Sequence, residues 1–432
     1  MVMKQYDSYK PSGVEWIGHI PSHWEVRRLK HVVSCNDEVL SEMTPPWSVI
    51  NYVEISDVTY INGIKGSTEY EFKDAPSRAR RITRVNDVII STVRTYLKAV
   101  ARVNVPDIIV STGFAVLRAQ SIDDLYLSYV VKSSGFIDDV VANSVGVTYP
   151  SITASKLMSL SLPLPHLEEQ ERIAEYLDRR CAEIDGIINK EEQAIALLDE
   201  LKQSIISEAV TRGLDPDAPL KPSGVDWIGN IPSHWQVWKV SHMFDNIGSG
   251  TTPSSSNKEY YTGSEGYHWL QTGDLNDGII RSTSKMVTQK AIDDYKLKFY
   301  PENSLVIAMY GATIGKIGLL DIDTATNQAC CVLPSSKVCL PIYAFYQFTA
   351  AKRYLLMEAV GGGQPNISQD IIKRTMVPLP PLEEQERIAE YLDKRCAEID
   401  EAKERKQRQI ELLREMKQTL ISDAVTGRVK VF

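Results

Sequence analysis

The chain has 432 residues, a formal net charge of -8, and 43% apolar and 24% charged residues. This composition is near that of an average soluble protein, and the length exceeds the roughly 250–300 residues that one hydrophobic core organises, which excludes a single small domain. No run approaches the ~18 consecutive apolar residues of a membrane span, and the first residues, MVMKQYDSYKPSG, lack the apolar centre of a signal peptide. We therefore expect a cytoplasmic protein of two globular domains with no membrane association.

Two segments occur twice along the chain. Residues 10–26 (KPSGVEWIGHIPSHWEV) recur at 221–237 (KPSGVDWIGNIPSHWQV), and residues 167–185 (LEEQERIAEYLDRRCAEID) return at 382–400 with one change, Arg179 to Lys394. The spacers between them, residues 27–161 and 238–376, are largely unrelated. A repeat of this length indicates a tandem domain duplication, because solenoid arrays have a period of ~20–50 residues.

The first spacer contains short strands and a basic segment. The run VIISTV at 88–93 is typical of a buried strand. Residues 76–104 hold seven Arg and Lys residues against one acid, Asp87. Arginine at this density suits contacts with phosphate and guanine, although a solvated strand face is the alternative. The candidate DNA contacts in this spacer are Arg78, Arg80, Arg81, Arg84, Arg94 and Lys98.

The first copy of the second repeat predicts a long helix. Pro163 and Pro165 keep the preceding chain extended, acidic residues follow at once, and helix-forming sequence continues to about Arg212, before Gly213. Some 45 residues at ~1.5 Å each make a helix of about 65 Å. Its apolar residues advance by alternating steps of four and three, the heptad pattern of a coiled coil. The positions that we assign to the coiled coil and to partner docking are Leu177, Ile184, Ile188, Ile195, Leu198 and Ile205.

The second spacer has fewer basic residues. Strands are predicted near 268–272 and at 305–309 (LVIAM), which supports a mixed α/β domain like the first. Asp57 and Asp274 align weakly between the spacers, as do Tyr149-Pro-Ser-Ile and Gln364-Pro-Asn-Ile. Glutamine and asparagine side chains suit the recognition of adenine. The polar and basic residues singled out in this spacer are Lys285, Tyr310, Thr313, Lys316, Gln364 and Asn366.

The second copy of the long helix repeats the heptad up to Gly427. The matching apolar residues are Leu392, Ile399, Ile410, Leu413 and Leu420. Each helix thus requires a partner helix, and pairing of the two copies with each other predicts an antiparallel coiled coil. A lone surface helix packed on a globular core is the alternative.

These elements predict an α+β fold. Two mixed α/β domains are separated by two long helices that form an antiparallel coiled coil, as a pseudo-twofold tandem duplication. The predicted boundaries are residues 1–161 for the first domain, 162–213 for the first helix, 214–376 for the second domain and 377–432 for the second helix.

No catalytic or metal-binding motif is complete. Residues 311–316 (GATIGK) resemble a phosphate loop with one residue too few, and residues 44–47 (TPPW) resemble a methyltransferase loop that lacks its amino-group ligand. His23 and His234 occupy the same repeat position and are interpreted as packing residues. The six cysteines show no CxxC and no zinc-type Cys/His spacing, so reduced structural thiols are expected. We expect a non-catalytic chain without a metal or a cofactor.

The two repeats together resemble a known family. The pattern Pro-Leu-Pro-x-Leu-Glu-Glu-Gln-Glu-Arg-Ile-Ala opens both helices, and Lys-Pro-Ser-Gly-Val-x-Trp-Ile-Gly-x-Ile-Pro-Ser-His-Trp precedes both spacers. This arrangement is similar to the specificity subunit of type I restriction-modification systems. The resemblance covers the whole chain. It implies that each variable domain reads one half of a split double-stranded DNA target with its loops. The candidate DNA contacts in the second domain are then Lys285, Tyr310, Thr313, Lys316, Gln364 and Asn366.

The resemblance also implies partners. The long helices dock two copies of a DNA adenine methyltransferase (M) subunit, which uses S-adenosylmethionine, and restriction (R) subunits that require ATP and Mg²⁺ complete the complex. Two near-identical helices with two unlike domains agree with two copies of one partner and a bipartite, non-palindromic target. Three alternatives stay open: a coiled-coil scaffold that does not bind DNA, a solitary specificity subunit serving a methyltransferase only, and an enzyme with an unrecognised active site.

Overall fold

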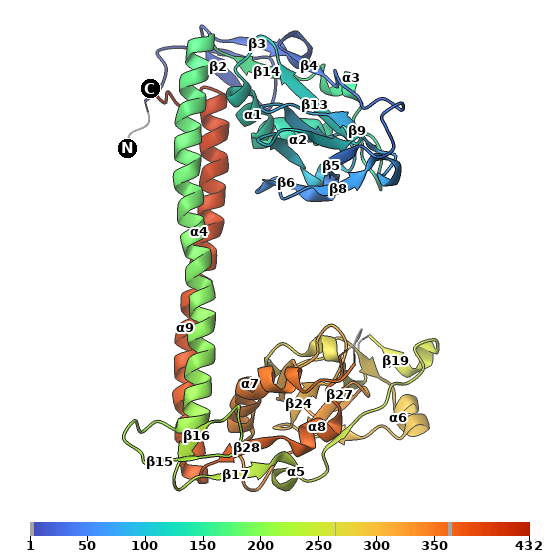
Figure 1. Cartoon of the computed structure of the whole chain (residues 1–432), viewed down its shortest axis with the longest axis vertical. Helices are drawn as coiled ribbons and strands as arrows, with labels where there is room; N and C mark the ends of the chain where they lie inside the picture. The colour runs from blue at the N-terminus through green and yellow to red at the C-terminus, as the bar shows by residue number, and fades with distance from the viewer. Residues whose placement is uncertain (1–3, 264, 362–364) are drawn as a thin grey trace. The chain divides into compact units, whose positions relative to one another are not determined.

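The computed structural model describes residues 4–263, 265–361 and 365–432. The chain divides into two compact units: unit 1 comprises Met1–Glu192 and Gln407–Phe432, and unit 2 comprises Gln193–Lys406. Each unit contains one spacer, one copy of each repeat and a part of both long helices, α4 (Leu167–Arg212) and α9 (Leu382–Val425) (Figure 1). The duplication predicted from the sequence is therefore also a duplication of structure.

Two four-stranded sheets enclose the core of unit 1. Their strand orders are β11-β10-β13-β4 and β8-β5-β12-β9, and β12 runs parallel to β5 while the other neighbours are antiparallel. Val53, Ile89, Val110 and Val116 bring the two sheets together in one apolar cluster. The strands of these sheets are β4 (Val33–Cys35), β5 (Val49–Val53), β8 (Thr68–Glu71), β9 (Ala79–Ile82), β10 (Val88–Ser91), β11 (Val100–Arg102), β12 (Ile108–Ser111) and β13 (Phe114–Ala119).

Short strand pairs and helices complete unit 1. Its strand pairs are β1 (Tyr9–Pro11) with β2 (His19–Pro21), β3 (Glu25–Arg28) with β14 (Ser161–Leu164), and β6 (Val58–Thr59) with β7 (Gly63–Ile64). Its helices besides the long ones are α1 (Asp124–Lys132), α2 (Ser134–Ala142), α3 (Ala154–Leu157) and the 3-10 helices η1 (Leu29–His31), η2 (Ile55–Asp57), η3 (Phe72–Asp74) and η4 (Thr95–Leu97).

Unit 2 repeats this plan with two five-stranded sheets. Their orders are β18-β27-β24-β25-β21 and β19-β22-β20-β26-β23, and β20 runs parallel to β26 just as β5 does to β12. Leu270, Val306, Leu320 and Val332 share one core cluster. The strands are β18 (Gly248–Ser249), β19 (Tyr261–Thr262), β20 (Tyr267–Leu270), β21 (Gly278–Ile280), β22 (Met286–Val287), β23 (Phe299–Tyr300), β24 (Leu305–Ala308), β25 (Ile317–Leu320), β26 (Thr324–Thr326) and β27 (Cys330–Leu333).

The further strand pairs of unit 2 match two of the three in unit 1. Its strand pairs are β15 (Leu220–Pro222) with β16 (Asn230–Pro232), and β17 (Gln236–Lys239) with β28 (Met376–Leu379). Its shorter helices are α5 (Val240–Met243), α6 (Gln289–Tyr295), α7 (Pro341–Met357), α8 (Gln369–Arg374), η5 (Lys258–Tyr260) and η6 (Thr272–Asp274). The strands predicted at 88–93, 268–272 and 305–309 correspond to β10, β20 and β24, whose apolar side chains are largely buried.

In unit 1 the beginning of α4 lies antiparallel to the end of α9 (Figure 1). Lys417 Nζ contacts Asp185 Oδ2 at 2.6 Å and Arg414 Nη2 contacts Glu192 Oε1 at 3.0 Å, so the chains advance in opposite directions. The predicted heptad residues Leu177, Ile184, Ile188, Ile410 and Leu420 are buried, and Leu413 is half-buried.

Unit 2 forms the same antiparallel pair from the end of α4 and the beginning of α9. Lys202 Nζ lies 2.7 Å from Asp400 Oδ2, which is the repeat equivalent of the Lys417–Asp185 pair, and Lys403 pairs with Asp199. Leu392 and Ile399 are buried, while Ile195, Leu198 and Ile205 are half-buried. The antiparallel coiled coil predicted from the heptads is therefore present within each unit.

In each unit the near-identical repeat contributes a buried glutamine that hydrogen-bonds the long helix to the rest of the unit. The buried Gln170 side chain accepts a hydrogen bond from the Asp123 backbone N–H at 2.9 Å and donates one to the Pro165 carbonyl, and so ties α4 to the start of α1. Gln385 does the same between Leu340 and Pro380 in unit 2. Part of the repeat is thus identical because each unit needs it to fold.

The cysteines are thiols throughout. All six are free, and only Cys35 is not buried. Burial raises the pKa of the Cys181 thiol to about 11, which keeps it protonated and unreactive near neutral pH.

Two repeat-equivalent tryptophans differ in one hydrogen bond. Trp24 and Trp235 are both fully buried, but Trp235 Nε1 donates to Glu384 Oε2 at 2.8 Å, whereas Trp24 Nε1 is buried without a partner. In unit 1 the equivalent carboxylate, Glu169, instead accepts from the Tyr6 hydroxyl at 2.8 Å.

We predict that Trp235→Phe lowers the free energy of unfolding by about 1–2 kcal/mol more than Trp24→Phe. Both changes remove the same volume, but only the first breaks a hydrogen bond to a charged acceptor. Urea unfolding of the two variants measures the difference. Equal losses, or a larger loss for Trp24→Phe, would contradict the assignment.

Candidate DNA-reading surfaces

In unit 1 the loop that follows β10 has an unusual backbone. Arg94 and Lys98 flank η4, and both have a left-handed conformation with φ of 50° and 51°. Such a conformation costs about 1–2 kcal/mol for a residue other than glycine. Val93 and Val145 each bridge to Ser151, so this loop lies against the segment 145–151.

A cleft of about 600 Å³ opens beside this loop. Arg94 lines it, with its guanidinium carbon 5.0 Å from the centre of the Tyr149 ring. Arg78 lines the same cleft from the chain that leads into β9. The residues around the cleft come from five segments of the chain and are Glu54, Ile55, Ser56, Arg78, Val93, Arg94, Leu97, Thr112, Gly113 and Tyr149. Two predicted DNA contacts, sixteen residues apart in the sequence, thus line the same cleft.

Two of the other predicted cations of unit 1, Arg80 and Lys98, have partners inside the unit. Arg80 lies over the Phe72 ring at 4.9 Å and donates to the Ala79 carbonyl at 3.0 Å. Lys98 Nζ pairs with Asp138 Oδ1 at 2.9 Å. Arg81, on β9, is half-buried, and its Nε is buried without a hydrogen-bond partner. The role of these three residues in DNA binding stays a prediction.

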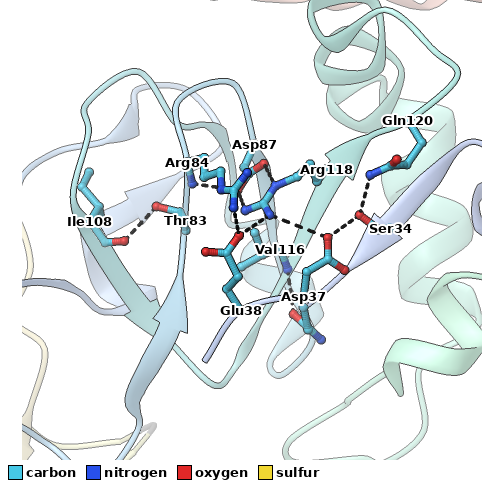
Figure 2. Close-up of polar contacts among 11 residues, drawn as sticks. Ser34, Asp37, Glu38, Thr83, Arg84, Asp87, Ile108, Val116, Arg118 and Gln120 are labelled. Carbon is cyan, nitrogen blue, oxygen red and sulfur yellow. Dashed lines mark hydrogen bonds and ion pairs between the residues drawn. The ribbon is translucent and has the colours of Figure 1, made fainter. Parts of the chain in front are cut away.

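Arg84 belongs to an ionic network that the sequence did not predict (Figure 2). At its centre, Arg118 on β13 donates from Nε and Nη2 to the two carboxylate oxygens of Asp87, at 2.9 and 2.8 Å. Arg118 Nη1 also donates to Glu38 at 2.6 Å, and Arg84 Nη2 pairs with the same carboxylate at 2.6 Å. Hydrogen bonds to Asp87 raise the pKa of the Arg118 guanidinium above its usual value. These cations are neutralised by the unit's own acids and hold its sheets together.

Unit 2 places its predicted contacts on the equivalent loop. Tyr310 and Val360 each bridge to Asn366, just as Val93 and Val145 bridge to Ser151. Thr313 and Lys316 are half-buried in the loop after β24, where the Lys316 backbone N–H donates to the Thr313 carbonyl at 3.0 Å. Lys285 is exposed, with Nζ 5.8 Å from the centre of the Tyr261 ring, and Gln364 lies outside the described residues.

The two units therefore hold one loop framework with different side chains. The weak alignment of Asp57 with Asp274 is confirmed, because each closes a capping box, with Glu54 on η2 and with Gln271 on η6. The alignment of Ser151 with Asn366 is confirmed by the matching bridges. At the positions of Arg94 and Lys98, unit 2 has Gly311 and Gly315, with φ of 88° and 75°.

The histidines of the repeat bind carboxylates near the start of the long helices. His23 Nε2 lies 2.9 Å from Glu169 Oε2, and His234 Nε2 lies 2.7 Å from Glu384 Oε1. Both contacts are internal to one unit, which agrees with a packing role. Residues 4–263, 265–361 and 365–432 contain no group of three or more His, Cys, Asp or Glu side chains arranged to hold a metal ion.

Comparison with known proteins decides the family. The type I restriction modification DNA specificity domain matches residues 21–197 and again residues 232–412, which together cover most of the chain. The chain belongs to this family. Each match contains one spacer and the repeat that follows it, so each structural unit of this type I specificity protein is built mainly from one family domain.

Individual relatives agree with the family. The type I restriction enzyme MjaVIII specificity subunit of Methanocaldococcus jannaschii is 27% identical over 72% of this chain and 71% of its own. The EcoBI specificity subunit of Escherichia coli is 24% identical over 68% and 64%. A solved structure from work on the complex assembly and conformational transition of the type I R-M system has a TM-score of 0.73 at 23% identity, and the match covers 94% of this chain and 98% of that one. This last likeness supports the fold of the type I specificity protein. Among the described helices, none is long and apolar enough to cross a membrane.

Proposed function

We propose that this chain directs a type I restriction-modification complex to a bipartite, non-palindromic DNA target, with unit 1 reading one half-site and unit 2 the other. The observation that carries the proposal is the shared loop framework: the loops after β10 and β24 have matching backbone contacts but different side chains. A surface that is fixed in backbone and variable in side chains suits base recognition, because bases are distinguished by side-chain donors and acceptors in the grooves.

The proposal assigns catalysis to partner subunits. Two copies of a DNA adenine methyltransferase subunit transfer methyl groups from S-adenosylmethionine to adenine N6, and restriction subunits use ATP and Mg²⁺, all in the cytoplasm. Support for two identical partners comes from the exposed face of the repeat. Glu171 and Glu175 in α4 are identical to Glu386 and Glu390 in α9, and all four are exposed.

The apolar heptad residues of the long helices have a more restricted part in this proposal. Leu177, Ile184 and Leu392 are buried inside their own unit, and Leu392 belongs to the apolar core of unit 2, so they support the surface that a partner contacts. Their direct role in docking stays a prediction. The exposed identical glutamates are the positions that a basic partner surface reaches first.

Exchange of one spacer tests the proposal. We predict that replacing residues 27–161 with the equivalent segment of a relative of different specificity changes one half of the methylated sequence and leaves the other half intact. The reciprocal exchange of residues 238–376 is the matched control and should change only the other half. Methylation mapped with the partner methyltransferase present gives the answer.

Each competing function predicts a different outcome of the exchange. A scaffold that never contacts DNA predicts an unchanged methylated sequence after either replacement. An enzyme with its own active site predicts methyl transfer or cleavage by the purified chain alone. A solitary specificity subunit predicts methylation in cells that contain no restriction subunit.

A further inference from the structure

Arg94 has a left-handed backbone conformation, and the equivalent loop of unit 2 has a glycine at this position. Its φ is 50°, and the repeat-equivalent residue in unit 2 is Gly311. Glycine adopts the left-handed region without steric cost, whereas arginine does not. Strained non-glycine residues cluster at functional sites, so an observed outlier is a reason to look for a role.

The Arg94 side chain is presented to solvent in a defined orientation. Its guanidinium stacks on the exposed Tyr149 ring at 5.0 Å, which restricts its rotamers before any ligand arrives. Within the described part of the chain, neither Arg94 nor Arg78 forms an ion pair with an acid, in contrast to Arg84, Lys98 and Arg118. The donors of Arg94 therefore remain available to an external acceptor.

Glu54 supplies the complementary group in the same cleft. It is exposed, and its side chain accepts from the Asp57 backbone N–H as part of the capping box. Arginine donors suit O6 and N7 of guanine, and a carboxylate suits the N4 amino group of cytosine. In unit 2 the matching positions hold Gly311 and Gln271, which provide neither a cation nor an acid.

We infer that Arg94 reads the guanine of a G·C base pair in the half-site recognised by unit 1. Its strained backbone and the Tyr149 ring hold the guanidinium in place for two parallel hydrogen bonds to the base. The assignment rests on the proposed function of the chain and adds the base class that unit 1 requires. The equivalent loop of unit 2 has glycine in place of Arg94, so the two DNA half-sites differ at the equivalent base pair.

Arg94→Gly in the complete methyltransferase complex tests the inference. The substrates are duplexes carrying the mapped target and its single-base-pair variants in each half-site. We expect preference for one G·C pair of the first half-site to fall roughly 5- to 150-fold, with recognition of the second half-site unchanged. Because glycine relieves the left-handed strain, the urea midpoint of the variant should equal or exceed that of the parent chain.

Lys98→Gly is the matched control. Lys98 has the same conformation in the same loop and also corresponds to a glycine, Gly315, but its ammonium is paired with Asp138. A phosphate contact from Lys98 would change affinity equally on all sequences, so its replacement should leave the preference among base pairs unchanged.

Three results would overturn the inference. One is an equal loss on all sequences with Arg94→Gly, which would identify a phosphate contact. Another is no change at any base pair. The last is a loss of the same base preference with Lys98→Gly. If exchange of residues 27–161 also leaves the methylated sequence unchanged, the proposed function itself fails; if that exchange works and Arg94→Gly does nothing, only the assignment of Arg94 fails.

Discussion

Asp87→Ala is expected to lower the free energy of unfolding of unit 1 by about 3–5 kcal/mol. The side chain of Asp87 is 3% exposed and accepts hydrogen bonds from Nε and Nη2 of Arg118. It also accepts one from the Arg84 backbone N–H at 2.8 Å (Figure 2). Removing it leaves a largely buried guanidinium with only the Glu38 contact and the distant Asp37. A buried cation that has lost its main counter-charge is among the costliest defects in a protein interior.

Asp37→Ala is the matched control for this prediction. Its carboxylate lies 3.7 Å from Arg118 Nη1 and its side chain is 35% exposed, so its loss should cost less than about 1 kcal/mol. Urea unfolding of the full chain measures both variants, and the transition of unit 2 should not move. A loss for Asp87→Ala no greater than that for Asp37→Ala would show that the network does not stabilise the unit.

Gly250→Ala should be as damaging in unit 2. A Cβ atom at this position would lie 1.7 Å from the Thr326 carbonyl oxygen and 2.4 Å from its carbonyl carbon. Since the obstacle is backbone in β26, no side-chain rotation relieves the clash, and the segment after β18 must move away. We expect a loss at or above the top of the ~1–3 kcal/mol range for overpacking.

The displacement should also reach the candidate DNA-reading surface. Thr252, two residues further on, contacts Gln328, and the carbonyl of the next residue, Ala329, accepts from the Met309 backbone N–H at 2.8 Å, one residue before Tyr310. Recognition of the second half-site should therefore weaken together with stability. Gly273→Ala is the control, because a Cβ there meets nothing within 4 Å. Unchanged unfolding of Gly250→Ala, or an equal effect of Gly273→Ala, would contradict the packing described for β18 and β26.

The sequence predicted the long helices well because their signals are local. Heptads, acidic first turns and the glycine after Arg212 act within a few residues, and α4 ends one residue before Gly213. The buried strands β10 and β24 were found for the same reason. The pairing of Lys417 with Asp185 and of Lys202 with Asp400 was not predicted, since it depends on register across the helix pair.

The candidate site was predicted less completely because its chemistry is non-local. The cations of residues 76–104 form one run in the sequence, but the structure places them in different surroundings. Arg78 and Arg94 line a cleft, while Arg84 pairs with Glu38. The acids that neutralise part of the run lie elsewhere in the sequence: Glu38, which pairs with Arg84, precedes it, and Asp138, which pairs with Lys98, follows it. Only Asp87, the one acid of the basic segment, was a local sign of the network.

The near-identity of residues 167–185 and 382–400 also has two causes, whereas only partner docking was predicted from the sequence. Residues such as Gln170 and Gln385 are identical because they join the helix to its own domain by buried hydrogen bonds. Exposed positions such as Glu171 and Glu386 meet no such requirement. The docking interpretation therefore applies to the exposed half of the repeat.

Mapping N6-methyladenine in cells that carry this chain with its methyltransferase subunit tests the central claim most directly. We predict one methylated motif made of two unlike half-sites separated by a fixed gap of unspecified bases, with a G·C pair in the half that changes when residues 27–161 are exchanged. The motif should vanish when the chain is deleted. A palindromic or continuous motif, or methylation that persists without the chain, would contradict the account.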